Sequence, residues 1–170
     1  MWEYRGQKRP PFAEPVGAGQ ESVWDFPRPP KAVPCNRTVE VSHNGIVIGR
    51  STKTYRVLET ASPPTFYLPA NDVDWPQLVK APGSSLCEWK GLAAYWALTL
   101  DPSGAPVAWS YGDPHQEFEM LRAHASFYPG RVACYVDGER VRPQPGEFYG
   151  GWVTSELVGP FKGAAGSQHW

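Results

Sequence analysis

The sequence lacks three features that define large classes of proteins. Its cysteines, Cys35, Cys87 and Cys134, are odd in number and widely spaced, which argues against a disulfide framework and leaves no Cys-x-x-Cys pair for zinc. The formal net charge is −1, so no charge excess attracts nucleic acid or an acidic membrane surface. No stretch approaches the roughly 18 apolar residues of a membrane span, and no signal-peptide core is visible. We therefore expect a cytoplasmic protein with free thiols, without metal or other cofactor, and with neither nucleic acid nor a membrane as partner.

The sequence is instead rich in aromatic residues and in residues that break helices. Aromatic residues make up 14% of the 170 positions and include eight tryptophans, and 19 prolines and 17 glycines interrupt the chain. Large aromatic side chains with frequent breakers favour strands and turns over long helices. The length is that of one domain with a single core.

The distribution of proline, glycine and apolar residues predicts three segments. Residues 1–36 are rich in proline and show no periodic apolar pattern, so we expect an extended arm that becomes ordered only by docking. Residues 37–142 are expected to form the domain. Residues 143–170, rich in glycine, proline and aromatic residues, are expected to form a second arm packed on it.

Alternation of apolar and polar residues predicts strands throughout the central segment. Val39 and Val41 alternate with polar residues, Asn44-Gly45 supplies a type I′ turn, and Ile46 and Ile48 resume the alternation, which predicts a hairpin. The further strands are expected in TKTYRVLET, TFYL after a Pro-Pro break, SLCEWKGLAAYW as one long central strand, VAWSY, ASFYP and VACYV.

One helix is expected, in PHQEFEMLRAH, with Phe118 and Leu121, and Met120 beside them, on its buried side. About eight short strands with one helix indicate an all-β protein with a minor α component. Its two antiparallel sheets should form a sandwich or an open barrel.

Five motifs occur in order between residues 37 and 136: RVLET, YLPANDV, CEWKGLAAYW, AWSYGDP and SFYPGRV. Together they resemble the family catalogued as domain of unknown function 427, and the flanking segments resemble its longer bacterial form. The resemblance implies a β-tent-like fold, in which two antiparallel sheets meet at an angle. Relatives of that fold include zinc-pinned domains, but this chain lacks their paired cysteines.

The same family has sometimes carried a nucleotidyltransferase label. Such enzymes place a Gly-Ser turn before an Asp-x-Asp pair that holds the metal of the nucleoside triphosphate. Here Asp72 and Asp74 precede Gly83-Ser84, which is the reverse order, and no phosphate-binding loop is present. An Asp-x-Asp at this place is also ordinary turn chemistry. The nucleotidyltransferase interpretation is therefore the less favoured one.

Glu59 and Lys90 are candidates for acid and base catalysis. Glu59 continues the face of Tyr55 and Val57, where a carboxylate needs a partner or a raised pKa. Lys90 precedes Gly91, which permits a bulge or the close approach of a ligand. In the alternative interpretation, Glu59 is a strand-end carboxylate and Lys90 a lysine on a solvated strand face.

Cys87 is a third catalytic candidate, since a cation beside a thiol lowers its pKa and makes it a nucleophile. Strict alternation would place Cys87 and Lys90 on opposite faces of one strand, and a buried, inert thiol is the favoured alternative.

The candidate ligand-binding residues are aromatic or charged. Tyr95, Trp109 and Tyr111 are expected either to pack in the core or to form the walls of a cleft. Arg56 and Asp72 are expected to orient the ligand.

Two hypotheses about function follow from these residues. The first is a small-molecule-binding protein with a pocket between its sheets for a polar or heterocyclic metabolite, and with metal-independent acid/base chemistry if it is an enzyme. The second is an interaction or assembly protein, a homodimer or other homo-oligomer, whose terminal arms dock on a second subunit.

Overall fold

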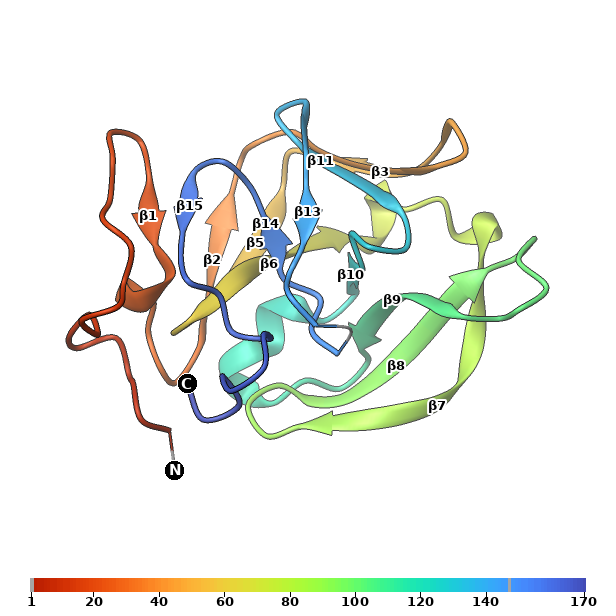
Figure 1. Cartoon of the computed structure of the whole chain (residues 1–170). Coiled ribbons are helices and arrows are strands. Elements are labelled where there is room, and N and C mark those ends of the chain that lie inside the picture. Colours follow the sequence, from red (N-terminus) through yellow and green to blue (C-terminus); the bar gives the residue numbers. More distant parts are fainter. Residues whose placement is uncertain (1, 147) are drawn as a thin grey trace.

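The computed structural model describes residues 2–146 and 148–170, and almost all of its regular structure is β (Figure 1). Strands hold 43% of the residues and helical turns 9%, which confirms the expected all-β class with a minor helical component. The strands are β1 Glu21–Ser22, β2 Lys31–Cys35, β3 Val39–His43, β4 Ile46–Ser51, β5 Thr54–Glu59, β6 Ser62–Pro69, β7 Leu78–Cys87, β8 Gly91–Leu98, β9 Pro106–Tyr111, β10 His124–Phe127, β11 Ala133–Val136, β12 Glu139–Arg140, β13 Arg142–Pro143, β14 Trp152–Val153 and β15 Leu157–Val158. The helical turns are η1 Val23–Asp25, η2 Ala70–Asp72, η3 Trp75–Gln77 and η4 Gln116–Leu121.

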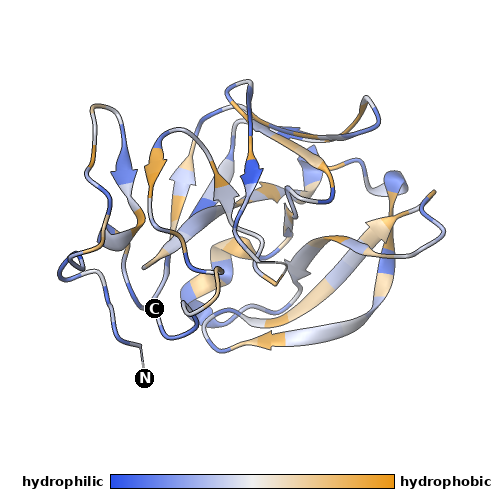
Figure 2. Ribbon diagram, in the orientation of Figure 1, coloured by the Kyte–Doolittle hydropathy of each residue, from blue (hydrophilic) through white to orange (hydrophobic). Residues whose placement is uncertain are grey.

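Two antiparallel sheets form the body of the molecule. The larger has seven strands in the order β2-β5-β6-β10-β9-β8-β7, and the smaller has four in the order β12-β11-β3-β4. The pairs β1-β15 and β13-β14 lie outside these sheets. In Figure 2 the strand β15 is hydrophobic and its parallel partner β1 is hydrophilic.

The space between the two sheets is filled by apolar side chains, which we call the inter-sheet core. The smaller sheet contributes Val39, Val41 and Ile48, and the larger contributes Phe66 and Leu68 among others. The C-terminal segment adds Trp152, which is fully buried and stacks on Phe66 with ring centroids 5.0 Å apart. This apolar packing occupies the place where we expected a pocket, so the expected position of the pocket was wrong.

The other face of the seven-stranded sheet carries a second cluster, which we call the aromatic face. Its buried members are Val57, Tyr67, Ala93, Trp109, Tyr111, Phe118 and Leu121. Successive residues of β6 point to opposite faces, so Phe66 and Leu68 join the inter-sheet core while Tyr67 joins the aromatic face. The helical turn η4 covers this face with Phe118 and Leu121, whereas Met120, which we also expected on the buried side, is exposed.

The predicted turns are confirmed, with one change in the hairpin. Asn44 and Gly45 have φ angles of 50° and 78°, as a type I′ turn requires, and Asp137-Gly138 turns in the same way. A register shift between Val41 and Ser42 interrupts the alternation. Ile46 is therefore exposed, whereas Ile48 is buried.

Four expectations about single elements were wrong. SLCEWKGLAAYW is the tip of the β7-β8 hairpin and not one strand, because the chain reverses between Cys87 and Gly91. The expected helix is a 3-10 segment with non-helical backbone at Phe118, in which residues three apart lie on one side. Regular structure begins before residue 37, with β1 and η1, and β2 is already a strand of the large sheet. Prolines 63 and 64 lie inside β6, opposite a register shift of β5 where no ladder bond needs their missing N–H groups.

The two terminal segments lie side by side at one end of the molecule (Figure 1). The main-chain N–H of Glu3 donates to the carbonyl oxygen of His169 at 3.4 Å. The ring of Phe12 stacks on that of Trp170, and Trp24 packs edge-on against both. These aromatic contacts hold both ends of the chain against the body.

Candidate functional site

The turn of the β7-β8 hairpin places Lys90 beside the aromatic face. Gly91 has a φ of 112°, in a region that glycine adopts most readily. The carbonyl of Lys90 accepts a hydrogen bond from the N–H of His115 at 3.0 Å, which ties the turn to the loop before η4. The Lys90 ammonium lies 6.0 Å from the ring centroid of Tyr111 and 5.8 Å from that of Phe118.

The environment of Lys90 favours its charged form. Burial acts to lower the pKa of Lys90, but Tyr67, Cys87 and Glu59 act in the opposite direction and leave the pKa raised. A raised pKa favours the charged ammonium form of Lys90, which is suited to attract an anion. The turn also removes the expected separation of Cys87 and Lys90, because Cys87 packs against the aromatic face.

The aromatic face keeps its hydroxyl groups protonated. The indole N–H of Trp109 donates to the hydroxyl of Tyr67 at 3.0 Å. Burial raises the pKa of Tyr67 and that of Tyr111. Tyr95 lies opposite Trp109 in the β8-β9 ladder, and its hydroxyl is 2.5 Å from that of Ser85. The raised pKa values make the phenol groups of Tyr67 and Tyr111 neutral hydrogen-bonding partners at physiological pH.

Glu59 pairs with a residue that sequence reasoning missed. The carboxylate of Glu59 accepts a hydrogen bond at 3.1 Å from Arg28, whose side chain is 1% exposed. The guanidinium also donates to the carbonyl oxygens of Tyr4 and Thr60 at 2.9 and 3.0 Å. Its Nε finds no hydrogen-bond partner among the described residues. An unpaired buried donor costs free energy, so this atom marks a place where a further acceptor would stabilise the protein.

A second missed residue is Lys162, from the C-terminal segment. Lys162 is only 3% exposed, and its Nζ donates to the main-chain oxygen of Trp170 at 3.3 Å. Burial lowers the pKa of Lys162 and the charge of Arg28 lowers it further, whereas Glu59 and Glu88 act to raise it.

Glu59 thus interacts electrostatically with cations from three parts of the chain. Its charge acts on the pKa of Lys90 and on that of Lys162, and it pairs directly with Arg28. We call Arg28, Lys90 and Lys162 around Glu59 the cation cluster. Arg28 and Lys162 both lie in segments that the sequence predicts to be arms. Their place in the cation cluster follows only from where these segments pack on the domain.

The remaining predicted residues lie elsewhere. Arg56 points away from the aromatic face and donates to both carboxylate oxygens of Glu21, at 2.7 and 3.3 Å. Asp72 lies in η2, and its neighbour Val73 pairs with Gly49 of the smaller sheet. Asp74 accepts a hydrogen bond from Gln77 at 2.6 Å. The structure therefore brings together Lys90, Cys87, Tyr95, Trp109 and Tyr111. Glu59 acts on Lys90 through its charge, whereas Arg56 and Asp72 lie elsewhere.

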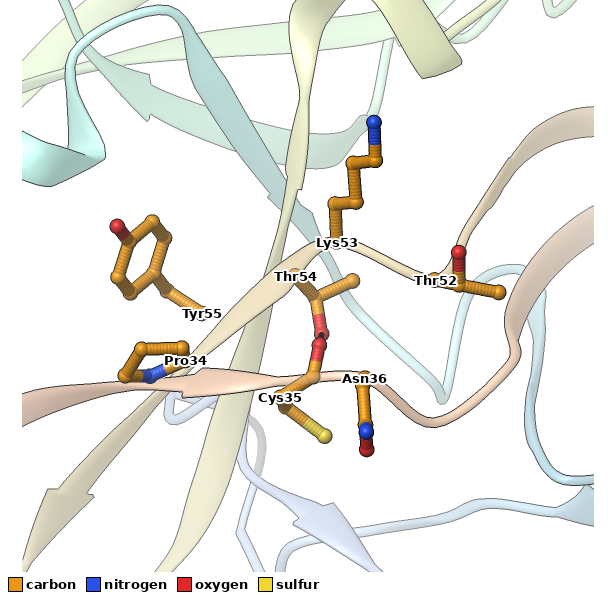
Figure 3. A pocket seen from close by; sticks show the side chains of 7 residues that line it. All are labelled: Pro34, Cys35, Asn36, Thr52, Lys53, Thr54 and Tyr55. Atoms are coloured by element: carbon orange, nitrogen blue, oxygen red, sulfur yellow. Dashed lines mark hydrogen bonds between the residues drawn. The ribbon is translucent and has the colours of Figure 1, made fainter.

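Two surface hollows contain none of the predicted site residues. The first, of about 510 Å³, lies at the ends of β2 and β5, and Figure 3 shows its seven lining residues, which include Cys35, Lys53 and Tyr55. The second, of about 470 Å³, includes His43, Arg131 and Arg140 among its lining residues.

Two searches for other features found nothing in residues 2–146 and 148–170. Within these ranges no helix is long and apolar enough to cross a membrane. In the same part of the chain no three His, Cys, Asp or Glu side chains lie close enough together to hold a metal ion.

Residues 31–138 match the family described as "Domain of unknown function (DUF427)". The chain belongs to this family. The match covers the seven-stranded sheet and strands β3, β4 and β11 of the smaller sheet, together with Glu59, Lys90 and the aromatic face, but it ends before β12 and includes neither Arg28 nor Lys162. No curated protein matches the chain. Membership of the family therefore does not say which chemistry the protein performs, and its function has to be inferred from the geometry of the site.

Proposed function

We propose that the protein binds a small, negatively charged metabolite at the cation cluster. The observation that supports this proposal is the imbalance of buried charge. Arg28 pairs with the half-buried Glu59, and the charge of the same carboxylate also acts on the pKa of Lys90 and, together with the exposed Glu88, on that of Lys162. Buried cations are costly unless paired, and an anionic ligand would supply the missing partner.

The aromatic side chains beside the cluster suit the rest of such a ligand. Tyr67, Trp109 and Tyr111 offer apolar surface together with neutral hydrogen-bonding groups. Lys90, held as an ammonium, would donate a proton if the bound metabolite is transformed, and Glu59 would then be the base. This is the acid/base pair expected from the sequence, extended by Arg28 and Lys162.

The competing assembly hypothesis has less support. Several large aromatic residues of the arms pack within the chain itself, since Trp152 fills the inter-sheet core and Phe12, Trp24 and Trp170 pack on one another, whereas Phe148 is 81% exposed. A homodimer held by the arms would have to use the residues that remain exposed after these intramolecular contacts are made. Its test is the molar mass in solution across a concentration series.

Ligand-induced thermal shifts test the binding proposal. Acetate, benzoate, phosphate and citrate are compared with chloride at equal ionic strength, using the intact protein and the variants Lys90→Met and Lys162→Met. The matched control is Lys53→Met, which removes an exposed cation at the first hollow. We expect at least one anion to stabilise the wild type and the control, by about 2.7 kcal/mol at 100 times its Kd.

The cluster variants should lose that shift while remaining folded. The proposal fails if every anion acts like chloride, or if Lys53→Met and Lys162→Met lose the same shift equally.

A further inference from the structure

The cation cluster already holds an aromatic ring. The guanidinium carbon of Arg28 lies 4.4 Å from the ring centroid of Trp2, and the Nζ of Lys162 lies 4.0 Å from it. A cation this close to an indole is attracted by the ring's quadrupole. The two cations cannot be farther apart than the sum of these distances, so both bound one space of the size of a single ring system.

Trp2 satisfies only part of what this space requires. The indole is neutral and adds no negative charge to that of Glu59, which pairs with Arg28, and the Nε of Arg28 has no hydrogen-bond partner among the described residues. A ring that carries a carboxylate would keep the cation–π contacts and add charge-assisted hydrogen bonds. The charged and hydrogen-bonding groups around this space thus suit a more polar ring than the indole of Trp2.

Besides its two cation–π contacts, Trp2 is held through its neighbour Glu3, and the contacts of Glu3 are weak. The main-chain hydrogen bond of Glu3 to His169 is long, at 3.4 Å. The ion pair of the same two residues, at 3.1 Å, is exposed on both sides and contributes about 0–1 kcal/mol even when the imidazole is charged. Tyr4, by contrast, is anchored by Arg28 and by the ring of Trp24 at 5.2 Å. Trp2 and Glu3 can therefore move away while the chain from Tyr4 onward stays in place.

Other groups bound the same space. The ring centroid of Tyr149 lies 5.6 Å from the Nζ of Lys162, and the main-chain oxygen of Trp170 accepts a hydrogen bond from that amine. The space therefore has aromatic surface on the C-terminal side as well as cations at its base.

We infer that the ligand is a flat aromatic or heteroaromatic carboxylate whose ring takes the place of the Trp2 indole between Arg28 and Lys162. This inference rests on the proposed function and narrows it to one class of anion. The carboxylate accepts from Arg28 and Lys162, and the ring occupies the space that Trp2 vacates. Trp2 acts as an internal competitor, so it weakens the binding of the ligand.

The test compares Trp2→Ala with Trp2→Phe, which retains a ring. Four probes are titrated by calorimetry: benzoate, cyclohexanecarboxylate as a non-aromatic anion, benzamide as a neutral aromatic, and acetate. We expect benzoate to bind Trp2→Ala about tenfold more tightly than the wild type, because the competing cation–π contacts are removed. Trp2→Phe should stay within about threefold of the wild type.

In Trp2→Ala, cyclohexanecarboxylate and benzamide should each bind at least about tenfold more weakly than benzoate. Adding Lys162→Met to Trp2→Ala should abolish benzoate binding while the melting temperature remains that of a folded protein.

Equal affinity for benzoate and cyclohexanecarboxylate would overturn the aromatic class but leave anion binding intact. Benzoate affinity unchanged by Trp2→Ala would overturn the displacement of Trp2. If no anion, phosphate and citrate included, binds any variant, the proposed function itself fails.

Discussion

Strand β6 contributes Phe66 and Leu68 to one face of the large sheet and Tyr67 to the other, and the two faces bury their residues in different ways. In the inter-sheet core the neighbours are mainly valine, isoleucine, leucine and phenylalanine, with Trp152 as a fully buried tryptophan among them. Its indole N–H donates to the carbonyl of Phe127 at 2.9 Å. Every polar atom of that tryptophan is therefore satisfied within the fold.

The aromatic face, with the cation cluster beside it, contains more polar and charged groups than the inter-sheet core. It holds buried hydroxyl groups, the ammonium of Lys90 and the guanidinium of Arg28 with one unpaired donor. A fold that needed only stability would fill this face as it fills the other, because replacing buried ions by apolar residues is often neutral or stabilising. The difference suggests that one face maintains the fold and that the other keeps polar groups for a ligand.

The largest expected effect comes from a substitution in the inter-sheet core. Trp152→Ala removes a fully buried indole that stacks on Phe66, and should lower the free energy of unfolding by about 3–5 kcal/mol. Tyr67→Phe, on the opposite face, removes only the hydroxyl that accepts from Trp109, and should cost about 1–2 kcal/mol. Urea unfolding measures both, and equal losses would contradict the assignment of stability to the inter-sheet core.

An intermediate effect is expected at Arg28. Arg28→Met leaves the carbonyls of Tyr4 and Thr60 and the carboxylate of Glu59 without their donor, and should cost roughly 2–4 kcal/mol. Adding Glu59→Gln should recover part of this loss, because the unpaired charge is removed. The same unfolding experiment on the single and double variants gives the coupling energy. A loss below about 1 kcal/mol would mean that Arg28 is dispensable for folding.

The smallest effect is expected at the turn that positions Lys90. Gly91→Ala places a side chain at a φ of 112°, where the new Cβ meets the carbonyl oxygen of Asp113 at 3.3 Å, and should cost about 1–2 kcal/mol. The matched control is Gly112→Ala, which has open space around the new Cβ and no left-handed backbone. Its effect should stay within about 0.5 kcal/mol. If both variants are equally stable, the turn does not constrain Lys90.

Local chemistry made much of the fold predictable from the sequence. The turn at Asn44-Gly45 and the alternation around Val39 and Val41 follow from φ preferences and from the two-residue period of a strand. The errors arose where tertiary contacts override these rules. Examples are the reversal at Gly91, which the apolar run through SLCEWKGLAAYW concealed, and the prolines accommodated within β6.

The candidate site divides in the same way. Glu59, Lys90, Cys87 and the aromatic residues near them could be selected from their own strands and motifs. No local pattern marks Arg28 or Lys162, because each lies in a segment without periodicity.

The sequence by itself thus determined the β class, the turns and the residue types available for chemistry, since these depend on neighbouring residues. Only the tertiary structure decided which of those residues meet. Docking of the two terminal segments brings cations from opposite ends of the chain to one carboxylate, and a charge acquires its chemical role from the groups that surround it in space.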